Sequence, residues 1–341
     1  MSGFTKDIIQ EFQSFGSEEY KIRILELIEQ EICNALADTK DDIRDMCSHI
    51  LSAGGKRIRP LLVVYSGLLF SELSVELMNA AVASEFIHMA SLIHDDIIDN
   101  SSLRRGKPSI NNVWGNHYAV LCGDYLFARA FGILATDSLI KSMEYMVDAI
   151  KNMCEGEIQQ AGDRYNYEVN VDRYYERIAK KTAIFLKDCC LSGSHIGGAG
   201  EAYKGIIGDY GLNFGLAYQI LDDILDFCGD PDSMGKPKYE DLSQGNATLP
   251  VILLLADEKY RLWAKNFLLN NGLTEDSISE ISKVMWKAGV FDKALIMAEN
   301  HTNKAAACLD LIPGSRFTGF LLQLIDAMRM KIHSVKPFTQ V

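Results

Sequence analysis

Proline is scarce in this sequence of 341 residues, and its absence from two long stretches is informative. Only 7 prolines occur, none of them before Pro60 and none between Pro108 and Pro231. Proline removes a backbone donor and interrupts helices, so these stretches favour a helical chain. Hydrophobic residues make up 48% of the sequence, which is ample for a large buried core and excludes global disorder.

Positive charge is also in short supply. Lysine and arginine together number 34 against 46 aspartates and glutamates, which gives a formal net charge of −12. Proteins that coat nucleic acid bind its phosphates through an excess of basic groups, so we expect no nucleic-acid partner. The longest apolar run, residues 61–70, includes a serine and a glycine. A membrane-spanning helix needs about twenty apolar residues, so we expect no membrane span.

Signals for export and for disulfide pairing are missing as well. Of the 8 cysteines, none forms a CxxC pair, and the neighbours Cys189 and Cys190 cannot easily form an ordinary disulfide. Residues 1–15 lack the basic and then apolar pattern of a secretory signal. We therefore expect a soluble protein in a reducing, cytoplasmic compartment.

Apolar residues recur at helical intervals along most of the chain. Residues 74–99 keep this period, and similar patterns run through 118–139, 142–161, 174–196, 206–227 and 315–332. No glycine–serine linker, charge block or repeat of fixed period divides the sequence. Glycine, proline and asparagine cluster around 100–111 and 229–246, where we expect loops. The sequence predicts one all-helical domain over residues 1–341.

Two short segments, IHDDIID and LDDILD, each place three carboxylates at positions i, i+1 and i+4. They are Asp95, Asp96 and Asp99 in the first and Asp222, Asp223 and Asp226 in the second. On a helix the first and last carboxylates lie on one face a turn apart. Two such groups facing each other need a cation between them, and oxygen-only ligands suit Mg²⁺ shared with a phosphate. A solvated acidic face on each helix is the alternative, and two copies in apolar settings weigh against it.

Basic residues are concentrated in two loops. Residues 54–60 read GGKRIRP just before a helical run, and residues 104–108 read RRGKP shortly after Asp99. Glycines free backbone amides and arginine forks match phosphate oxygens, so both loops are candidate diphosphate pockets. Solvated surface loops are the alternative for each one taken alone. Lys181 with Thr182, and Lys236 within GKP, are weaker candidates for the same role.

In chain order, these motifs resemble those of the trans-isoprenyl (polyprenyl) diphosphate synthases. The matching segments are GGKRIRP, HDDIID with LRRGKPS, KKTA, and YQILDDILDF with GKPKYEDLSQGNATLP, and the resemblance covers roughly residues 36–311. It implies a bundle of antiparallel helices around a deep central cavity. It also implies head-to-tail condensation of isopentenyl diphosphate onto an allylic diphosphate. Residues 154–168 and 177–178 are most similar to the catalytic component of bacterial heptaprenyl diphosphate synthases.

The resemblance implies roles for individual residues, with the six aspartates binding Mg²⁺ on the allylic diphosphate. The isopentenyl diphosphate ligands would be Gly55, Lys56, Arg59, His88 and Arg105. The allylic side would be held by Arg104, Lys181, Thr182, Gln219 and Lys236. The allylic C–O bond would ionise, the alkene would attack the cation, and a proton would be lost, with released diphosphate as a candidate base. Tyr218 stands where the family usually has phenylalanine, and the following Gln219 is intact.

Other functions share single features of this pattern. Glu85 and His88 form an ExxH unit of the kind found in di-iron bundles, but such a site needs two units and the sequence has one. A satisfied core histidine is another alternative for His88. Terpene cyclases also use DDxxD but typically lack the GGKRIRP pocket, and non-catalytic subunits of heteromeric synthases characteristically lack both aspartate motifs. We expect a homodimer or the catalytic half of a heterodimer, which would be inactive alone.

Small residues precede the first aspartate group. Ser91 and Ala90 lie four and five positions before Asp95, about 6–7.5 Å back along a helix, where short-chain members of the family have a bulky aromatic floor. Ile87 and Ser84 also avoid aromatics. We therefore expect a long product, hexaprenyl to octaprenyl with heptaprenyl favoured, for a quinone side chain. A short-chain farnesyl or geranylgeranyl synthase, with its floor elsewhere, is the alternative.

Overall fold

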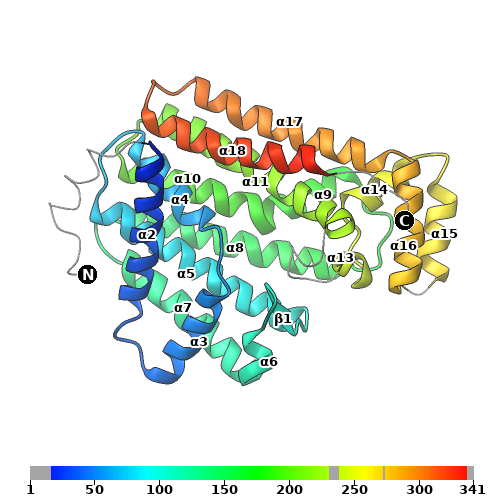
Figure 1. Cartoon of the computed structure of the whole chain (residues 1–341), viewed down its shortest axis with the longest axis horizontal. Helices are drawn as coiled ribbons and strands as arrows, with labels where there is room; N and C mark the ends of the chain where they lie inside the picture. The colour runs from blue at the N-terminus through cyan, green and yellow to red at the C-terminus, as the bar shows by residue number, and fades with distance from the viewer. Residues whose placement is uncertain (1–16, 230–237, 272, 336–341) are drawn as a thin grey trace. The chain divides into compact units, whose positions relative to one another are not determined.

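The structure of the chain is a computed structural model, which describes residues 17–229, 238–271 and 273–335 (Figure 1). In these described ranges the elements are α-helices, one π-helical turn and a single pair of two-residue strands. The prediction of an all-helical fold is therefore confirmed for the described part of the chain. The residues group into two compact units, the first made of 1–150, 186–208 and 309–322 and the second of 151–185, 209–308 and 323–341.

Helices follow the periodic segments of the sequence to within a few residues. Residues 74–99 form α5 (Val75–Ile98), and the next two patterns form α7 (Asn116–Leu134) and α8 (Ile140–Gly162). The later patterns form α9 (Val171–Ile178), the π-helical turn η1 (Ala179–Ala183), α10 (Ile184–Ile196), α11 (Glu201–Cys228) and α18 (Arg316–Ser334). The division between the units falls within α8, α10, α11, α17 and α18. A single domain over residues 1–341 stays a prediction.

The first unit is built around α5, which lies against α2 (Ser17–Ala35), α4 (Ile58–Leu68) and α7. Figure 1 shows α5 and α7 running side by side in this unit. The helix begins at Ser74, whose side chain accepts a hydrogen bond from the Leu77 N–H at 3.2 Å and so caps the first turn. Most α5 side chains from Leu77 to Ala90 are buried, which explains why its sequence is apolar on nearly every side.

Glycines allow a close approach between α4 and α10 in the same unit. A Cβ atom on Gly193 would lie 2.0 Å from the Val63 carbonyl oxygen, and one on Gly197 would lie 2.5 Å from the Gly67 carbonyl oxygen. Real Cβ atoms do not come so near, so larger residues at these positions would force the helices apart.

A short hairpin interrupts the segment 100–111, where the sequence predicted only a loop. Strands β1 (Leu103–Arg104) and β2 (Lys107–Pro108) are antiparallel, with Arg104 opposite Lys107. Arg105 and Gly106 connect them with φ values of +51° and +76°. Two consecutive left-handed residues match the twist of a two-residue hairpin turn. The unit also contains α3 (Asp41–Ser52) and α6 (Ile110–Trp114).

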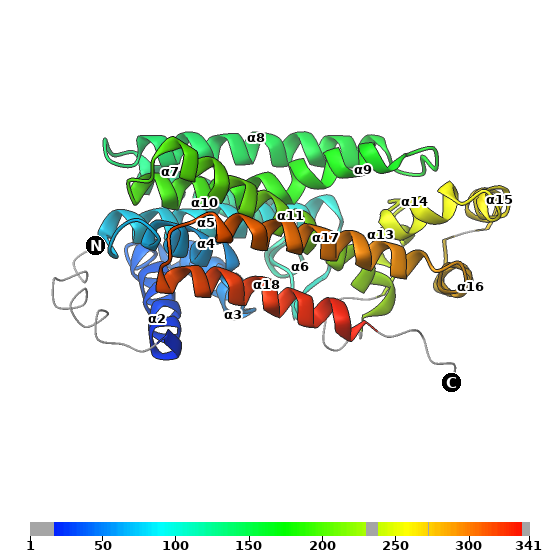
Figure 2. The ribbon, with the colours of Figure 1, turned by 90° about the horizontal axis from the view of Figure 1, so that it is seen from above.

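The second unit has its own apolar centre in α14 (Leu249–Ala256), which contacts α9, α15 (Arg261–Asn270) and α16 (Glu275–Lys287). Helix α13 (Glu240–Ser243) is a single turn. Residues of α17 (Val290–Asp310) and α18 that belong to this unit lie side by side (Figure 2). Arg329 joins them by donating hydrogen bonds to Thr302 Oγ1 at 3.4 Å and to Asn303 Oδ1 at 2.7 Å. Within the described residues, no helix combines the length and apolar character needed to cross a membrane.

Candidate active site

The first aspartate group occupies the end of α5. Asp95 and Asp99 are partly exposed and lie one turn apart, as their spacing predicted. His88 and Ser91 are also partly exposed, and their spacing from Asp95 puts them on the same face of the helix. This face therefore carries two carboxylates and one imidazole on a helix that is otherwise largely buried.

Asp96, the middle residue of the group, is engaged by the protein. Its side chain is buried, and its Oδ1 accepts hydrogen bonds from Nε of Arg104 at 2.9 Å and from Nη2 of the same guanidinium. Burial raises the pKa of Asp96, and Arg104 opposes that shift. Asp96 therefore fixes Arg104 beside the aspartate group, and the partly exposed ligand candidates are Asp95 and Asp99.

The two neighbouring arginines of the hairpin, Arg104 and Arg105, bond to different partners. Arg104 bonds to Asp96, whereas Nη1 of Arg105 donates to the carbonyl oxygen of Gly54 in the first basic loop. Lys107 adds hydrogen bonds from Nζ to the carbonyl oxygen and hydroxyl of Ser52 at 2.6 and 3.0 Å. These contacts tie the hairpin to the loop that follows α3. They support the separate roles that the resemblance implies for Arg104 and Arg105.

The first basic loop also approaches His88. Burial and the positive charges of Arg59 and Arg105 hold the pKa of His88 well below its ordinary value, so this imidazole is neutral at pH 7. Lys56 is exposed, and Arg59 is partly exposed near the start of α4. A Cβ atom on Gly55 would lie 2.7 Å from Nη1 of Arg105, so a larger residue there would displace this guanidinium. Four of the five residues predicted to hold isopentenyl diphosphate are thus linked by contact or by charge.

Arg57 lies within the same loop, and the sequence reasoning gave it no role of its own. Its guanidinium is buried and bonds to carboxylates of Glu29 and Glu85. Glu85 is therefore engaged by an arginine, which argues against the di-iron alternative for the ExxH unit. In the sequence, Glu85 stands out as an acidic residue one turn before His88 on an apolar helix. Its partner Arg57 is 28 positions away, so the pairing could not be predicted from local spacing.

The second aspartate group lies on α11, in the second unit. Asp222 is partly exposed, and Asp223 and Asp226 are buried. Asp223 accepts hydrogen bonds from the Tyr174 hydroxyl at 2.7 Å and from Nε2 of Gln219 at 2.8 Å. Burial and the charge of Asp241 raise the pKa of Asp223 to about 7. The middle aspartate is again held by the protein.

Asp226 faces the turn that starts α13. Its Oδ1 accepts a hydrogen bond from the Glu240 N–H at 3.3 Å, and its carbonyl oxygen accepts one from the Tyr239 N–H at 2.9 Å. This aspartate is fully buried, so it fixes the start of α13 as well as being a predicted ligand.

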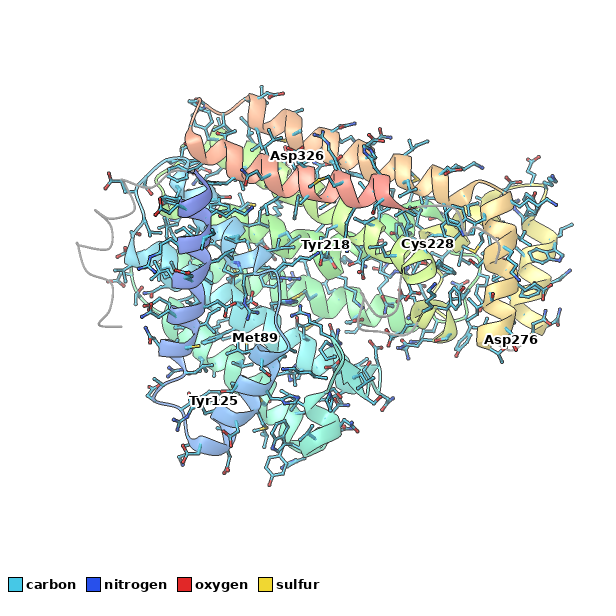
Figure 3. All side chains as sticks on the ribbon, in the orientation of Figure 1. Met89, Tyr125, Tyr218, Cys228, Asp276 and Asp326 are labelled. Carbon is cyan, nitrogen blue, oxygen red and sulfur yellow. The ribbon has the colours of Figure 1, made fainter. Side chains whose placement is uncertain are left out.

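Thr182, Gln219 and Asp223 form a hydrogen-bonded chain. The Thr182 hydroxyl donates to Oε1 of Gln219 at 2.7 Å, which turns the amide nitrogen of Gln219 toward Asp223. Thr182 lies in η1, and π-helical turns often occur at functional sites. Figure 3 labels Tyr218 and Cys228 on α11, the helix that carries Gln219 and the aspartates. The structure thus brings two predicted allylic-side residues into direct contact.

Lys181, a predicted allylic-side residue, is paired with side chains of α8. Nζ of Lys181 forms an ion pair with Glu157 at 2.5 Å and lies 3.4 Å from Oε1 of Gln160. Lys236 lies outside the described residues. Its role on the allylic side stays a prediction.

The predicted chain-length residues are not equally accessible. Ser84, Ile87 and Ala90 have no exposed surface, whereas Ser91 is partly exposed on the face that carries Asp95. Ser91 donates a hydrogen bond from its hydroxyl to the His88 carbonyl oxygen at 2.9 Å. Met89, labelled in Figure 3, is also buried on this helix. Ser91 is therefore the member of the set best placed to meet a growing chain.

The donor set fits a hard divalent cation. Asp95 and Asp99 in the first unit, and Asp222 in the second, each offer partly exposed carboxylate oxygens, a ligand type that suits Mg²⁺. Across the described ranges, no three histidine, cysteine or acidic side chains lie close enough together to enclose a metal ion.

Comparisons with known proteins point the same way. The sequence profile described as Polyprenyl synthetase matches residues 40–285. Heptaprenyl diphosphate synthase component 2 of Geobacillus stearothermophilus is 36% identical over 304 residues, covering 88% of this chain and 93% of that protein. A short chain isoprenyl diphosphate synthase of Methanothermobacter thermautotrophicus is 31% identical over 315 residues, covering 90% and 96%. The crystal structure of a polyprenyl synthase from Caulobacter crescentus, complexed with calcium and isoprenyl diphosphate, superposes with a TM-score of 0.84 at 31% identity, covering 92% and 95%.

Proposed function

The chain belongs to the polyprenyl synthetase family and is a trans-polyprenyl diphosphate synthase, and we propose that its product is long. Hexaprenyl to octaprenyl is the proposed range, with heptaprenyl favoured. Ser91 supports this proposal, because it is a small and partly exposed side chain one turn before Asp95. The similarity to a heptaprenyl diphosphate synthase component supports it independently.

A short-chain product is the alternative, because this chain is 36% identical to a heptaprenyl diphosphate synthase component and 31% identical to a short chain isoprenyl diphosphate synthase. The two readings differ in where the growing chain meets a floor. Under the long-chain proposal, Ser91 lets the product pass along α5. Under the alternative, another side chain stops growth at farnesyl or geranylgeranyl.

The proposed reaction uses Mg²⁺ and the basic residues to hold the allylic diphosphate. When bound, Mg²⁺ would neutralise the leaving diphosphate, and the partly exposed carboxylates of Asp95, Asp99 and Asp222 are its proposed ligands. Arg104, fixed by Asp96, would bind a diphosphate oxygen. Lys56, Arg59 and Arg105 would hold isopentenyl diphosphate beside the neutral imidazole of His88.

Thr182 and Gln219 are proposed to stabilise the allylic cation. The Thr182 hydroxyl hydrogen is used in the bond to Gln219, which leaves oxygen lone pairs of Thr182 available to a positive centre. Gln219 is in turn oriented by Asp223. Fixed dipoles of this kind stabilise charge without rearranging during the reaction.

The proposed assembly is a homodimer or a heterodimer with a non-catalytic subunit. The relative from Geobacillus stearothermophilus is named a component, which supports the second form. Both aspartate groups are present, so this chain is proposed as the catalytic member. A cytoplasmic location stays a prediction from the cysteine pattern.

Product length tests the proposal. Products of the wild-type protein and of Ser91→Phe are dephosphorylated and separated by reversed-phase chromatography beside prenyl alcohol standards. We expect hexaprenyl to octaprenyl products from the wild type and a shift toward farnesyl or geranylgeranyl in the variant, because the ring fills the path along α5. Wild-type products that stop at those short lengths would establish the alternative.

A further inference from the structure

A buried ion cluster anchors the first basic loop. Arg57 donates from Nε to Glu29 Oε1 at 2.6 Å, from Nη2 to Glu29 Oε2 at 3.2 Å, and from Nη1 to Glu85 Oε1 at 2.8 Å. The side chains of Arg57 and Glu85 are 5% and 4% exposed, and that of Glu29 is 47% exposed. One guanidinium thus joins α2, α5 and the loop before α4.

These contacts occupy the Arg57 guanidinium. Burial acts to lower the pKa of Arg57, but the hydrogen bonds and charges of Glu29 and Glu85 outweigh it and raise that pKa. Three N–H groups of the Arg57 guanidinium are bonded to carboxylates. The guanidinium therefore does not present its N–H groups to a phosphate, as an arginine that binds phosphate does. Because a buried ion pair is weak evidence for net stability, the arrangement that it holds is the more informative feature.

The backbone of Arg57 explains what the cluster holds. Arg57 has φ +50° and ψ +37°, a left-handed conformation that non-glycine residues adopt at an energetic cost. This residue starts α4, with Lys56 immediately before it and Arg59 in the first turn. The hydrogen bonds from Arg57 to Glu29 and Glu85 hold the backbone in this conformation. The conformation of Arg57 in turn determines the directions in which the chain carries Lys56 and Arg59.

The cluster also reaches the other members of the pocket. A Cβ atom on Gly55 would lie 2.9 Å from Nη1 of Arg57 and 2.7 Å from Nη1 of Arg105, so both guanidinium groups border Gly55. Glu85 lies one helical turn before His88 on α5. Arg57 therefore lies where the loop, the hairpin and α5 meet.

We propose that Arg57 is a positioning residue for the isopentenyl diphosphate pocket, held by Glu29 and Glu85 so that Lys56, Arg59, Arg105 and His88 converge on one diphosphate. The inference rests on the proposed assignment of that pocket. It differs from a ligand role, because Arg57 acts through the loop and does not touch the substrate.

Steady-state kinetics of Arg57→Met, Glu85→Gln and the double variant separate the two roles. If Arg57 positions the loop, each single variant raises the KM for isopentenyl diphosphate by about tenfold or more, the size of one charge-assisted contact. The KM for the allylic substrate and kcat change less than about twofold. The double variant resembles the single ones, because both changes break the same contact.

A ligand role predicts another pattern. Glu85→Gln would then free the guanidinium for phosphate and leave the KM for isopentenyl diphosphate unchanged or lower, and the effects of the two changes would add. Either result overturns the proposal. Equal losses for both substrates also overturn it.

Three further variants distinguish a specific effect on the KM for isopentenyl diphosphate from a general loss of folded protein. Glu29→Gln alters the half-exposed partner and should raise the same KM by a smaller factor, and Arg57→Lys should recover part of the loss. Glu26→Gln is the matched control on α2, since Glu26 forms an exposed ion pair with Arg23 of the same helix. Wild-type protein that fails to use isopentenyl diphosphate would refute the proposed function itself. An active wild type with unaffected variants would refute only the role of Arg57.

Discussion

Within each aspartate group, the three carboxylates have different surroundings. Asp96 and Asp223 are buried and bonded to Arg104 or to Tyr174 and Gln219. Asp95 and Asp222 are partly exposed. The middle aspartates therefore organise neighbouring side chains, and the first aspartates are the more accessible of the proposed metal ligands.

Removing a first aspartate should abolish most of the activity. We expect Asp95→Ala or Asp222→Ala to lower kcat by a factor of about a hundred or more, because charge on the leaving diphosphate loses its stabilisation. Asp226→Ala should lower kcat less but reduce the melting temperature, because Asp226 is fully buried and bonded to Glu240. Turnover is measured with saturating Mg²⁺, and circular dichroism checks the fold. Full turnover in a well-folded Asp95 variant would contradict the metal assignment.

Asp188 gives a prediction about pH that is independent of the site. Burial, with help from the charge of Asp148, raises the pKa of Asp188 to about 8, from an ordinary value of 3.8. Oδ2 of Asp188 has no hydrogen-bond partner among the described residues. The folded protein therefore keeps a proton that the unfolded chain loses, and the free energy of unfolding falls as the pH rises between these values. The slope from one group is at most about 1.4 kcal/mol per pH unit.

Asp188→Asn should remove this contribution. Urea unfolding of the wild type and the variant at pH 5 and pH 8 measures it. We expect the variant to lose less stability than the wild type between the two pH values. Parallel changes in both proteins would show that Asp188 ionises normally.

Among the elements, η1 and α11 depend on a close contact. A Cβ atom on Gly215 would lie 2.5 Å from the Cα atom of Ala183, the residue after Thr182. Gly215 is therefore required for the bond between Thr182 and Gln219 to form at its present length. A displacement of about 1 Å at such a site can lower turnover a hundredfold.

Gly215→Ala should thus lower kcat by about tenfold to a hundredfold, with a smaller effect on the KM for isopentenyl diphosphate. Gly205→Ala is the matched control on α11, because a Cβ atom there meets nothing within 4 Å. The control should keep its activity and gain about 0.5–1 kcal/mol, since alanine is the better helix former. Normal turnover in Gly215→Ala would mean that the contact is not needed for activity.

Helices were predictable from the sequence, and the long-range contacts were not. The apolar period is a local signal, and it located α5 to within a residue of each end. The β1–β2 hairpin was missed because it depends on Arg105 reaching Gly54, about fifty positions away in the chain. Arg57 looked like one member of a basic run, since its pairing with Glu29 and Glu85 is visible only in three dimensions.

The aspartate and basic motifs gave the family directly because their order and spacing are specific. The spacing could not separate the role of Asp96 from that of Asp95, because burial and the approach of Arg104 decide it. Three of the four chain-length candidates are fully buried on α5, which packs against α2, α4 and α7, and these helix contacts could not be predicted from the sequence.

At the scale of the whole molecule, acidic net charge and local basic loops work together. The chain has a formal net charge of −12, yet both basic loops of the first unit lie near the aspartate-bearing end of α5. An anionic diphosphate is therefore attracted to the two basic loops of an otherwise acidic protein. Binding at these positions is local, so the charge of the whole chain does not oppose it at physiological salt.

Elongation of an allylic diphosphate by labelled isopentenyl diphosphate is the most direct test. The purified chain is assayed alone and with host extract, with Mg²⁺ or with EDTA, and the products are sized. We predict Mg²⁺-dependent incorporation into hexaprenyl to octaprenyl products, with heptaprenyl dominant, by the chain alone or after a partner is supplied. Incorporation that is unaffected by EDTA, or no incorporation under any of these conditions, would contradict the account.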